Sequence, residues 1–523
     1  MTNRTKWAAA LVLVVLLWAV FYPNVFVVRD SLVADGAFSL EHYQRFSQSH
    51  AELRALWNSV WISTISVLLS AIIGIPLAFF FARYDFPARK LLTALAAMPV
   101  LLPPLVGVIS FLFLYGETGF FTRGVQALFG LQDAPWRLNG PGAVLFVHAY
   151  TMYVYFFLFV SAALTRLDPS LLEAAAALGA SRRRALARVT LPMLAPAIGG
   201  AALLVFMTAM GSFSAPYVFG GGFRVLTTQI FASKLNGDLP IAAVETVILA
   251  AVSILFLWFL QRYEKDRIYT GASKGTARLR LVQPMSRGRK WLLTLAASLV
   301  VLLLILPHLT VLLVSFVPEG TWTTEVLPPR YSLENYQLIF GKRDALRPIL
   351  NSLVMATWAT AANVVFALVA AYVLARGKVR SRGLINALVI LPWALPGPVL
   401  AMALASTFSV NQPYTGRFVL VGTALILPLA YFIRNIPLVT RSTYATFQQI
   451  DPSLEEASAS LGGSALTTWR RVLIPLVAPG LAAGAMLAFV TALGEFVASI
   501  LLYNHRTRPI SIEILAQLRA FNF

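Results

Sequence analysis

The chain has 523 residues, of which 58% are hydrophobic and 12% are charged, and its formal net charge is +20. Its mean hydropathy of +0.73 excludes an ordinary soluble domain and indicates an integral membrane protein. The positive charge is spread over several short loops, so it does not indicate nucleic-acid binding. The absence of cysteine from the sequence excludes disulfides, thiolate metal sites and a cysteine nucleophile.

Apolar runs of roughly 20 residues, the length that crosses about 30 Å of hydrocarbon, recur along the chain. They predict an all-α polytopic membrane protein with eleven spans, at 7–28, 55–82, 91–115, 142–165, 193–216, 241–261, 291–317, 349–375, 384–408, 418–440 and 476–502. No small-residue cleavage site follows the first span, which favours an uncleaved anchor with a cytoplasmic N-terminus. Lys and Arg are concentrated in the loops that this orientation places in the cytoplasm.

The sequence also repeats itself. SLEHYQ at 39–44 recurs as SLENYQ at 332–337, and the pair Asn-Ser at 58–59 recurs at 351–352. An even number of predicted spans separates equivalent positions, so both halves have the same orientation. Two parallel halves would naturally pack about an axis along the membrane normal, with a pathway between them.

We therefore expect two six-helix halves, at 1–262 and 291–523, joined by a basic cytoplasmic linker at 263–290. The first half has a sixth span at 241–261. The second half reaches the matching external segment and stops at Phe523, so we expect a twelfth span to be missing there.

Two alanine-rich segments occupy equivalent places in the repeat. EAAAALGASRRRALARVTLP runs from 173 to 192, and EASASLGGSALTTWRRVLIP runs from 456 to 475. An Asp-Pro pair shortly before each segment is a strong signal for the start of a helix, and Gly179 and Gly462 are stop signals. Each copy therefore predicts a short helix of about ten residues.

An apolar stripe follows each helix at helical spacing, formed by Leu171, Ala174, Ala175 and Leu178 in the first copy and by Leu454, Ala457, Ser458 and Leu461 in the second. Glu173 and Glu456 lie on the opposite side of that stripe. A single such helix could lie on the lipid surface. Two copies in register, on the same side of the membrane, favour insertion into the grooves of partner subunits.

The order Glu-Ala-Ala, Gly and Leu-Pro resembles the cytoplasmic EAA loop of permease subunits in binding-protein-dependent ABC importers. The second copy differs from that pattern at Ser458 and Ile474. The resemblance covers nearly the whole chain, and each half is similar to one permease subunit of the type I fold.

That resemblance implies two cytoplasmic ATPase subunits, a periplasmic binding protein as a further partner, and a place in the bacterial inner membrane. It also implies coupling helices that use Glu173, Ala174, Ala175 and Gly179 in the first loop and Glu456, Ala457, Ser458 and Gly462 in the second. The fused halves, with MGSFSAPYVFGGG and LGEF after the loops, are most similar to the group that handles ferric iron, thiamine or aminoethylphosphonate. Ferric iron is the first expectation, with thiamine, aminoethylphosphonate or a polyamine as alternatives.

Motifs for chemistry are absent from the sequence: there is no phosphate-binding G-x-x-x-x-G-K-[ST], no H-E-x-x-H and no G-x-S-x-G. We therefore expect a transport subunit without its own ATPase site, catalytic residue, cofactor or resident metal. An intramembrane enzyme would need paired catalytic groups at similar depth. An ion-coupled secondary transporter would work without ATPase partners.

Candidates for the substrate pathway come from the spans. Pro103 and Pro396 interrupt spans at matching places, and such breaks either mark a midplane site or are structural kinks. Glu495 lies within a span, where a carboxylate is costly, so it should face the pathway or bond to backbone or Arg434. Its first-half counterpart is Ser212, which would make any acidic site asymmetric.

Two further polar residues, His148 and Glu245, lie near the outer ends of their spans. We expect them at the membrane interface and assign them no role in the pathway.

Overall fold

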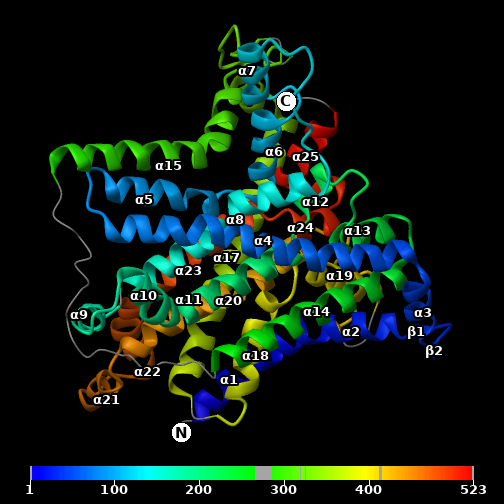
Figure 1. Cartoon of the computed structure of the whole chain (residues 1–523). Coiled ribbons are helices and arrows are strands. Elements are labelled where there is room, and N and C mark those ends of the chain that lie inside the picture. Colours follow the sequence, from blue (N-terminus) through cyan, green and yellow to red (C-terminus); the bar gives the residue numbers. More distant parts are fainter. Residues whose placement is uncertain are drawn as a thin grey trace. The chain divides into compact units, whose positions relative to one another are not determined.

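The computed structural model describes residues 3–165, 167–265, 286–318, 320–323, 325–377, 379–411 and 415–520 (Figure 1). Its regular structure is almost entirely helical, apart from one hairpin in which β1 (Val33–Ala34) pairs antiparallel with β2 (Ala37–Phe38). Helices satisfy their backbone hydrogen bonds internally, as a span in hydrocarbon requires. The predicted all-α membrane fold is confirmed, whereas most of the predicted linker at 263–290 lies outside the described residues.

One compact unit comprises residues 1–50, 229–250 and 337–523. Its helices are α1 (Asn3–Leu16), the π-helical η1 (Leu17–Phe21), α2 (Tyr22–Ser31), α3 (Glu41–Gln48), α17 (Arg343–Arg376), α18 (Arg382–Ala394), α19 (Gly397–Phe408), α20 (Ile426–Gln449), α21 (Ser453–Ser460), α22 (Ala465–Thr468), the π-helical η5 (Trp469–Leu473), α23 (Ile474–Leu493), α24 (Val497–Leu502), the 3-10 helix η6 (His505–Thr507) and α25 (Ile510–Arg519). α17, α20 and α23 form its core. Gly480 permits the close approach of α23 to α20, because an added Cβ would clash with Thr446 Oγ1.

The other unit comprises residues 51–228 and 251–336. Its helices are α4 (His50–Arg83), α5 (Arg89–Ala97), the 3-10 helix η2 (Met98–Leu101), α6 (Pro104–Tyr115), α7 (Phe120–Phe129), α8 (Gly140–Leu164), α9 (Pro169–Ala177), α10 (Arg182–Ala185), the π-helical η3 (Leu186–Thr190), α11 (Leu191–Met210), α12 (Ser214–Phe219) and α15 (Arg287–Ser315). α4 begins at His50, which belongs to the first unit, and three further helices, α13 (Leu226–Leu235), α14 (Leu239–Lys265) and α16 (Glu334–Gly341), also contain residues of both units. Buried aromatic side chains of α8, among them Tyr153, Phe156 and Phe157, fill the core of this unit against α4 and α11.

Each unit includes the first span of the opposite half of the sequence. α1 packs against α17 and α18, and α2 packs against α19, although these partners belong to the second half of the repeat. Conversely, α15 opens the second half and packs against α5 and α6. The compact units and the halves of the repeat therefore divide the chain differently.

The number of spans differs from the prediction of eleven. Among the described residues, nine helices are long and apolar enough to cross a membrane, or ten if the bent pair α18 and α19 forms one span. The predicted span at 418–440 corresponds to α20, which begins only at Ile426 because Arg417 and Gly422 have positive φ angles that a right-handed helix excludes. α20 is not among the nine and carries the polar residues Arg434 and Asn435.

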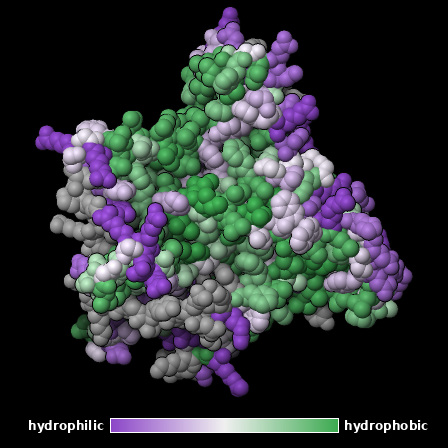
Figure 2. Space-filling model, in the orientation of Figure 1, coloured by the Kyte–Doolittle hydropathy of each residue, from purple (hydrophilic) through white to green (hydrophobic). Residues whose placement is uncertain are grey.

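Apolar side chains cover much of the surface of these helices (Figure 2). On α4, for example, Leu68 and Ile72 are exposed, and on α15 Leu292, Leu295 and Leu299 are exposed. Hydrophilic side chains gather toward the ends of the helices in the same view. This distribution is typical of helices that face lipid.

Candidate functional site

One surface loop in each unit carries the repeated Asp-Pro motif. In the first loop, α9 begins at Pro169, and the Asp168 carboxylate accepts a 2.9 Å hydrogen bond from the Ser170 N–H. In the second loop, the Asp451 carboxylate accepts a bond of the same length from the Ser453 N–H, which holds the pKa of Asp451 below its usual value. These caps satisfy backbone donors that the start of a helix leaves free.

Both short helices end in the same turn. Gly179 has a φ of 76° and Gly462 a φ of 77°, a left-handed conformation in which only glycine avoids a steric penalty. In the first loop the Ala180 N–H donates to the Ala175 carbonyl, and the second loop has the equivalent bond. This Schellman geometry fixes where each helix ends and where the chain turns.

The predicted coupling residues lie mostly at the surface of their own units. Six of them are exposed, Glu173, Ala174, Gly179, Glu456, Ala457 and Gly462, whereas Ala175 and Ser458 are partly buried. The two leucines at the helix ends, Leu178 and Leu461, are 88% and 89% exposed. Each loop therefore presents a carboxylate and an apolar tip that another chain can contact.

A π-helical turn joins each loop to the span that follows, at Leu186–Thr190 and at Trp469–Leu473. In both turns, the next residue donates its N–H to the carbonyl five positions back. Pro192 and Pro475 come next, and their rings exclude a regular α-helical contact with the preceding turn. These turns were not predicted from the sequence, although the paired prolines Pro192 and Pro475 were the available signal.

Glu495 lies between α23 and α24, and its side chain is half-buried. Its Oε1 accepts a 3.0 Å hydrogen bond from the Ala498 N–H, so the carboxylate caps the start of α24. The Glu495 carbonyl accepts bonds from the hydroxyls of Ser499 at 2.6 Å and Ser511 at 3.0 Å. The backbone bond anticipated as one alternative is therefore present.

Its counterpart Ser212 belongs to a buried polar cluster in the other unit. His148 connects two hydroxyls, with Nδ1 2.9 Å from Ser66 Oγ and Nε2 2.9 Å from Ser212 Oγ. The Ser212 carbonyl accepts a 2.7 Å bond from the Thr227 hydroxyl, as the Glu495 carbonyl does from Ser511. A neutral imidazole suits this place, because one of its ring nitrogens donates while the other accepts.

The expected position of His148 and Glu245 at the membrane interface stays a prediction, because burial within the protein does not give depth in the membrane. Both residues are buried, and Glu245 Oε1 accepts a 2.8 Å hydrogen bond from Ser233 Oγ. Sequence position along a span gives the depth of a residue, but it does not give the helix that covers it.

Side chains bond to backbone carbonyls that precede each of the two proline breaks. α18 and α19 meet at 108° around Pro396, and Arg434 Nη1 donates 2.8 Å bonds to the carbonyls of Pro392 and Leu395. In the first half, the Tyr153 hydroxyl donates a 2.6 Å bond to the Ala96 carbonyl at the end of α5, ahead of η2 and Pro103. Because these carbonyls already have protein donors, the contacts favour the structural-kink interpretation of the breaks.

The repeat is also visible in equivalent hydrogen bonds. Asn58 donates 2.8 Å to the Arg224 carbonyl, and Asn351 donates 2.9 Å to the Arg508 carbonyl. The adjacent Ser59 and Ser352 hydroxyls each accept a 2.8 Å bond from a backbone N–H two residues beyond that carbonyl. The Asn-Ser pairs therefore fasten an equivalent segment to a long helix in each half.

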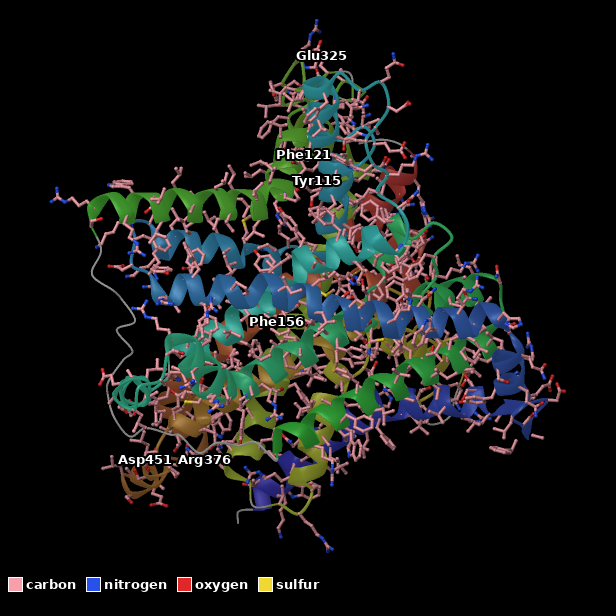
Figure 3. The ribbon with its side chains drawn as sticks, in the orientation of Figure 1. Tyr115, Phe121, Phe156, Glu325, Arg376 and Asp451 are labelled. Atoms are coloured by element: carbon pink, nitrogen blue, oxygen red, sulfur yellow. The ribbon has the colours of Figure 1, made fainter. Side chains whose placement is uncertain are left out.

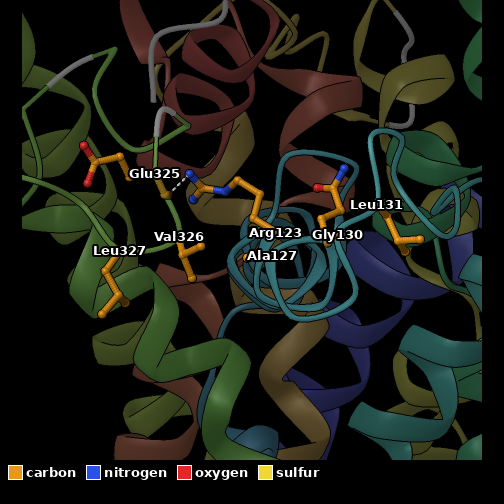
Figure 4. Close-up of a pocket in the computed structure, with 8 residues that line it drawn as sticks. Arg123, Ala127, Gly130, Leu131, Glu325, Val326 and Leu327 are labelled. Carbon is orange, nitrogen blue, oxygen red and sulfur yellow. Dashed lines mark hydrogen bonds between the residues drawn. The ribbon is translucent and has the colours of Figure 1, made fainter.

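An open hollow of about 810 Å³ lies between α7 and residues 325–327 (Figure 4). Arg123 crosses it and donates hydrogen bonds to the backbone carbonyls of Glu325 and Trp322. Its lining combines aliphatic residues with the polar residues Arg123, Gln126 and Glu325. Within the described residues, no group of three or more His, Cys, Asp or Glu side chains could hold a metal ion.

The chain also matches a known protein family. A family model described as the inner membrane component of binding-protein-dependent transport systems matches residues 74–269 and 363–515, and each segment contains one of the two loops. The chain is 31% identical over 510 residues to the probable ABC transporter permease protein y4fN of Sinorhizobium fredii (strain NBRC 101917 / NGR234), covering 96% of this chain and 89% of that protein.

It is also 25% identical over 509 residues to the ferric transport system permease protein FbpB of Actinobacillus pleuropneumoniae, covering 96% of this chain and 72% of that protein. Among solved structures, a bacterial alginate ABC transporter in complex with an alginate pentasaccharide-bound periplasmic protein aligns with a TM-score of 0.43 and 20% identity. This alignment covers 50% of this chain and 96% of that chain.

Proposed function

We propose, on the premise that this chain belongs to the inner-membrane components of binding-protein-dependent transport systems, that it forms the translocation pathway of an ATP-driven importer for ferric iron. The family model matches both halves of the chain, so the protein is a fused, multi-pass permease of the ABC type. Because its sequence contains no phosphate-binding motif, ATP hydrolysis is assigned to partner subunits.

The two loops are the docking sites for two ATPase subunits. The observation that carries this proposal is the exposure of Leu178 and Leu461 at equivalent positions, together with the exposure of the carboxylates of Glu173 and Glu456 on the same short helices. A short helix with an apolar tip and a carboxylate suits a groove that offers both apolar and basic contacts. Two such helices require two ATPase subunits, which are either two different chains or two copies of one chain.

Ferric iron is the proposed substrate, delivered by a periplasmic binding protein. This choice is supported by the similarity to the ferric permease FbpB over 96% of this chain. Glu495 and Ser212 remain the proposed pathway residues, with Pro103 and Pro396 at the breaks of the neighbouring spans. The half-buried carboxylate of Glu495 is suited to a cationic substrate.

The proposed orientation places the N-terminus and both loops in the cytoplasm. The excess of Lys and Arg in the corresponding connecting segments supports it. Reporter fusions after predicted loops would test this orientation: a fusion within 178–181 should be active only with a cytoplasmic reporter, and activity of a periplasmic reporter there would reverse the topology.

Copurification tests the docking proposal. The permease, expressed with the ATPase encoded beside it, should retain the ATPase on an affinity column, and the double variant Glu173→Gln/Glu456→Gln should lose most of it. The matched control is Glu41→Gln/Glu334→Gln, which removes two exposed helix-start carboxylates at equivalent positions elsewhere in the repeat. Equal loss in both double variants, or full retention in the first, would contradict the proposal.

Ligand binding by the neighbouring secreted binding protein tests the substrate. We expect it to bind Fe³⁺ and to support ATP-dependent iron uptake by the reconstituted complex. Binding of thiamine, a phosphonate or a polyamine in place of iron would reassign the substrate and leave the docking proposal intact. Uptake by the permease without any ATPase would instead identify a secondary transporter.

A further inference from the structure

The end of α17 holds the second loop through three hydrogen bonds, two from its last residue Arg376 and one from Tyr372. Arg376 Nε donates to Glu455 Oε1 at 3.0 Å, and its Nη2 donates to the Ile450 carbonyl at 2.6 Å. The Tyr372 hydroxyl donates to the other Glu455 oxygen at 3.0 Å. Figure 3 shows Arg376 beside Asp451 at this end of the unit. Both oxygens of the Glu455 carboxylate are therefore held by one membrane helix.

These groups are largely removed from water. The side chains of Arg376 and Glu455 are 16% and 22% exposed. Because both side chains are mostly buried, solvent and salt screen the attraction between them less than they screen a pair on an open surface. Tyr372 and Arg376 lie four residues apart on one face of α17, and the Tyr372 ring packs 5.0 Å from that of Trp469 in the π turn.

The first loop differs at two of the three positions. In the repeat, Leu172 occupies the place of Glu455 and Phe79 that of Tyr372, whereas Arg83 keeps the arginine of Arg376. A leucine accepts no hydrogen bond and a phenylalanine donates none. Arg83 lies over the ring of its neighbour Tyr84, with 5.8 Å between the guanidinium and the ring centre. The carboxylate-based attachment is therefore specific to the second loop.

α17 can transmit a displacement along its length. It has 34 residues and no described break, which corresponds to about 50 Å. Toward its opposite end, Asn351 and Ser352 bind the backbone at Arg508 and Ile510. The attachment at Arg376 and this second attachment lie about 38 Å apart along one helix. A movement of the second loop is therefore linked mechanically to the segment that precedes α25.

We propose that Arg376, Glu455 and Tyr372 are positioning residues that fasten the second loop to α17, so that the two loops are coupled unequally to the membrane helices. The proposal rests on the proposed function of the loops as ATPase docking sites. Movement of the ATPase at the second loop is transmitted through the ion pair to α17. At the first loop it passes through the partly buried side chain of Leu172 and through the π turn.

The test uses the whole transporter, with its ATPase and its binding protein, reconstituted in lipid vesicles. Substrate uptake and ATP hydrolysis are measured together. Arg376→Gln and Glu455→Gln should retain the ATPase and its stimulation by loaded binding protein, while uptake per ATP falls about tenfold, equivalent to about 1.4 kcal/mol. Arg376→Lys keeps the positive charge and should restore part of the lost uptake per ATP. Arg83→Gln is the matched control and should change the ratio by less than about twofold.

A second measurement separates positioning from folding. Since the sequence has no cysteine, Ser453→Cys in the second loop and Ser170→Cys in the first can each carry a single spin label. Glu455→Gln should increase the mobility of the label at 453 and leave that at 170 unchanged. An unchanged uptake ratio in both charge variants, an equal loss in Arg83→Gln, or equal mobility changes in both loops would overturn the proposal.

The same experiments distinguish a failure of the unequal attachment from a failure of the proposed function on which it rests. If the unmodified complex retains no ATPase and shows no ATP-dependent uptake, the proposed function fails. If the unmodified complex is coupled and Arg376→Gln is coupled equally well, only the unequal attachment fails.

Discussion

Ser458 Oγ lies 2.8 Å from Thr468 Oγ1, and this hydrogen bond joins α21 to α22 within the second loop. At the equivalent positions the first loop has Ala175 and Ala185. Ser458, at which the second copy departs from the Glu-Ala-Ala pattern, therefore bonds to Thr468, ten residues away. The two loops differ at both positions together, with two small apolar side chains in one and two mutually bonded hydroxyls in the other.

This pairing predicts a non-additive effect. Ser458→Ala or Thr468→Ala alone removes one partner of a partly buried bond and should cost about 1 kcal/mol of local stability. The double variant restores the alanine pair of the first loop and should cost less than the sum of the two. Hydrogen exchange of residues 453–473 measures these opening free energies. Additive losses would show that the two hydroxyls act independently.

The exposed leucines predict a loss of binding without a loss of folding. Leu178→Ser and Leu461→Ser remove side chains that are almost fully exposed, so the thermal unfolding midpoint of the isolated permease should stay the same. ATPase retention should fall about tenfold for the double variant, because the apolar tips enter the partner. Leu128→Ser, at an exposed position on α7, is the control. A lowered midpoint would instead indicate packing within the permease.

The turn after α9 predicts how strongly different substitutions at Gly179 destabilise the end of this helix. At Gly179, alanine must adopt a left-handed conformation at a cost of about 1 kcal/mol, whereas asparagine tolerates it better. Hydrogen exchange in 169–180 should therefore accelerate more for Gly179→Ala than for Gly179→Asn, and most for Gly179→Val. The same order should hold at Gly462. Equal hydrogen-exchange rates in all variants would show that the left-handed φ of this glycine does not determine where the helix ends.

Two substitutions at Glu495 should separate the effect of its negative charge on uptake from the effect of its helix cap on stability. In Glu495→Gln the amide oxygen can still accept the bond from the Ala498 N–H, so α24 should keep its start while the negative charge is lost. Uptake of a cationic substrate should then fall with unchanged stability. Glu495→Ala should reduce uptake and also destabilise the protein by about 1 kcal/mol. Unchanged uptake in Glu495→Gln would remove the carboxylate from the pathway.

Glu513 predicts a pH dependence. Burial raises its pKa, but hydrogen bonds from Arg508 and Gln517 outweigh that effect and hold the pKa below its usual 4.5. A carboxyl with a lowered pKa stabilises the folded state above pH 4.5, and that contribution is lost as the pH falls through the lowered value. Hydrogen exchange of α25 should therefore accelerate on acidification, and Glu513→Gln should be less sensitive. An identical pH profile in both proteins would contradict this assignment.

The loops were predictable because their signals are local. Asp-Pro, the alanine run and a glycine lie within about a dozen residues, and the residues near them determine helix start and helix end. The repeat then made the second copy independent support for the first. The spans were predictable for the same reason, except where backbone turns at Arg417 and Gly422 delay α20.

Contacts between distant helices were not predictable in this way. Arg376 and Glu455 are 79 positions apart, and Ser66 and His148 are 82 apart. Hydropathy shows that each lies near or within a span, but it does not show which helix is its neighbour. A comparison of the two halves offered a signal, since Glu455 stands where the first half has Leu172 and the arginine position is shared. That difference becomes informative only when the neighbours are known.

The placement of α1 has a consequence for the order of synthesis. α1 leaves the ribosome long before α17, against which it packs, because α1 ends at Leu16 and α17 begins only at Arg343. At about 5–20 residues per second, α1 waits on the order of tens of seconds for its partner. Its buried face consists of Ala9, Val12 and Leu16, which lipid tails can cover at little cost during that interval. An apolar face therefore allows α1 to remain in the bilayer until the later-made α17 is available to pack against it.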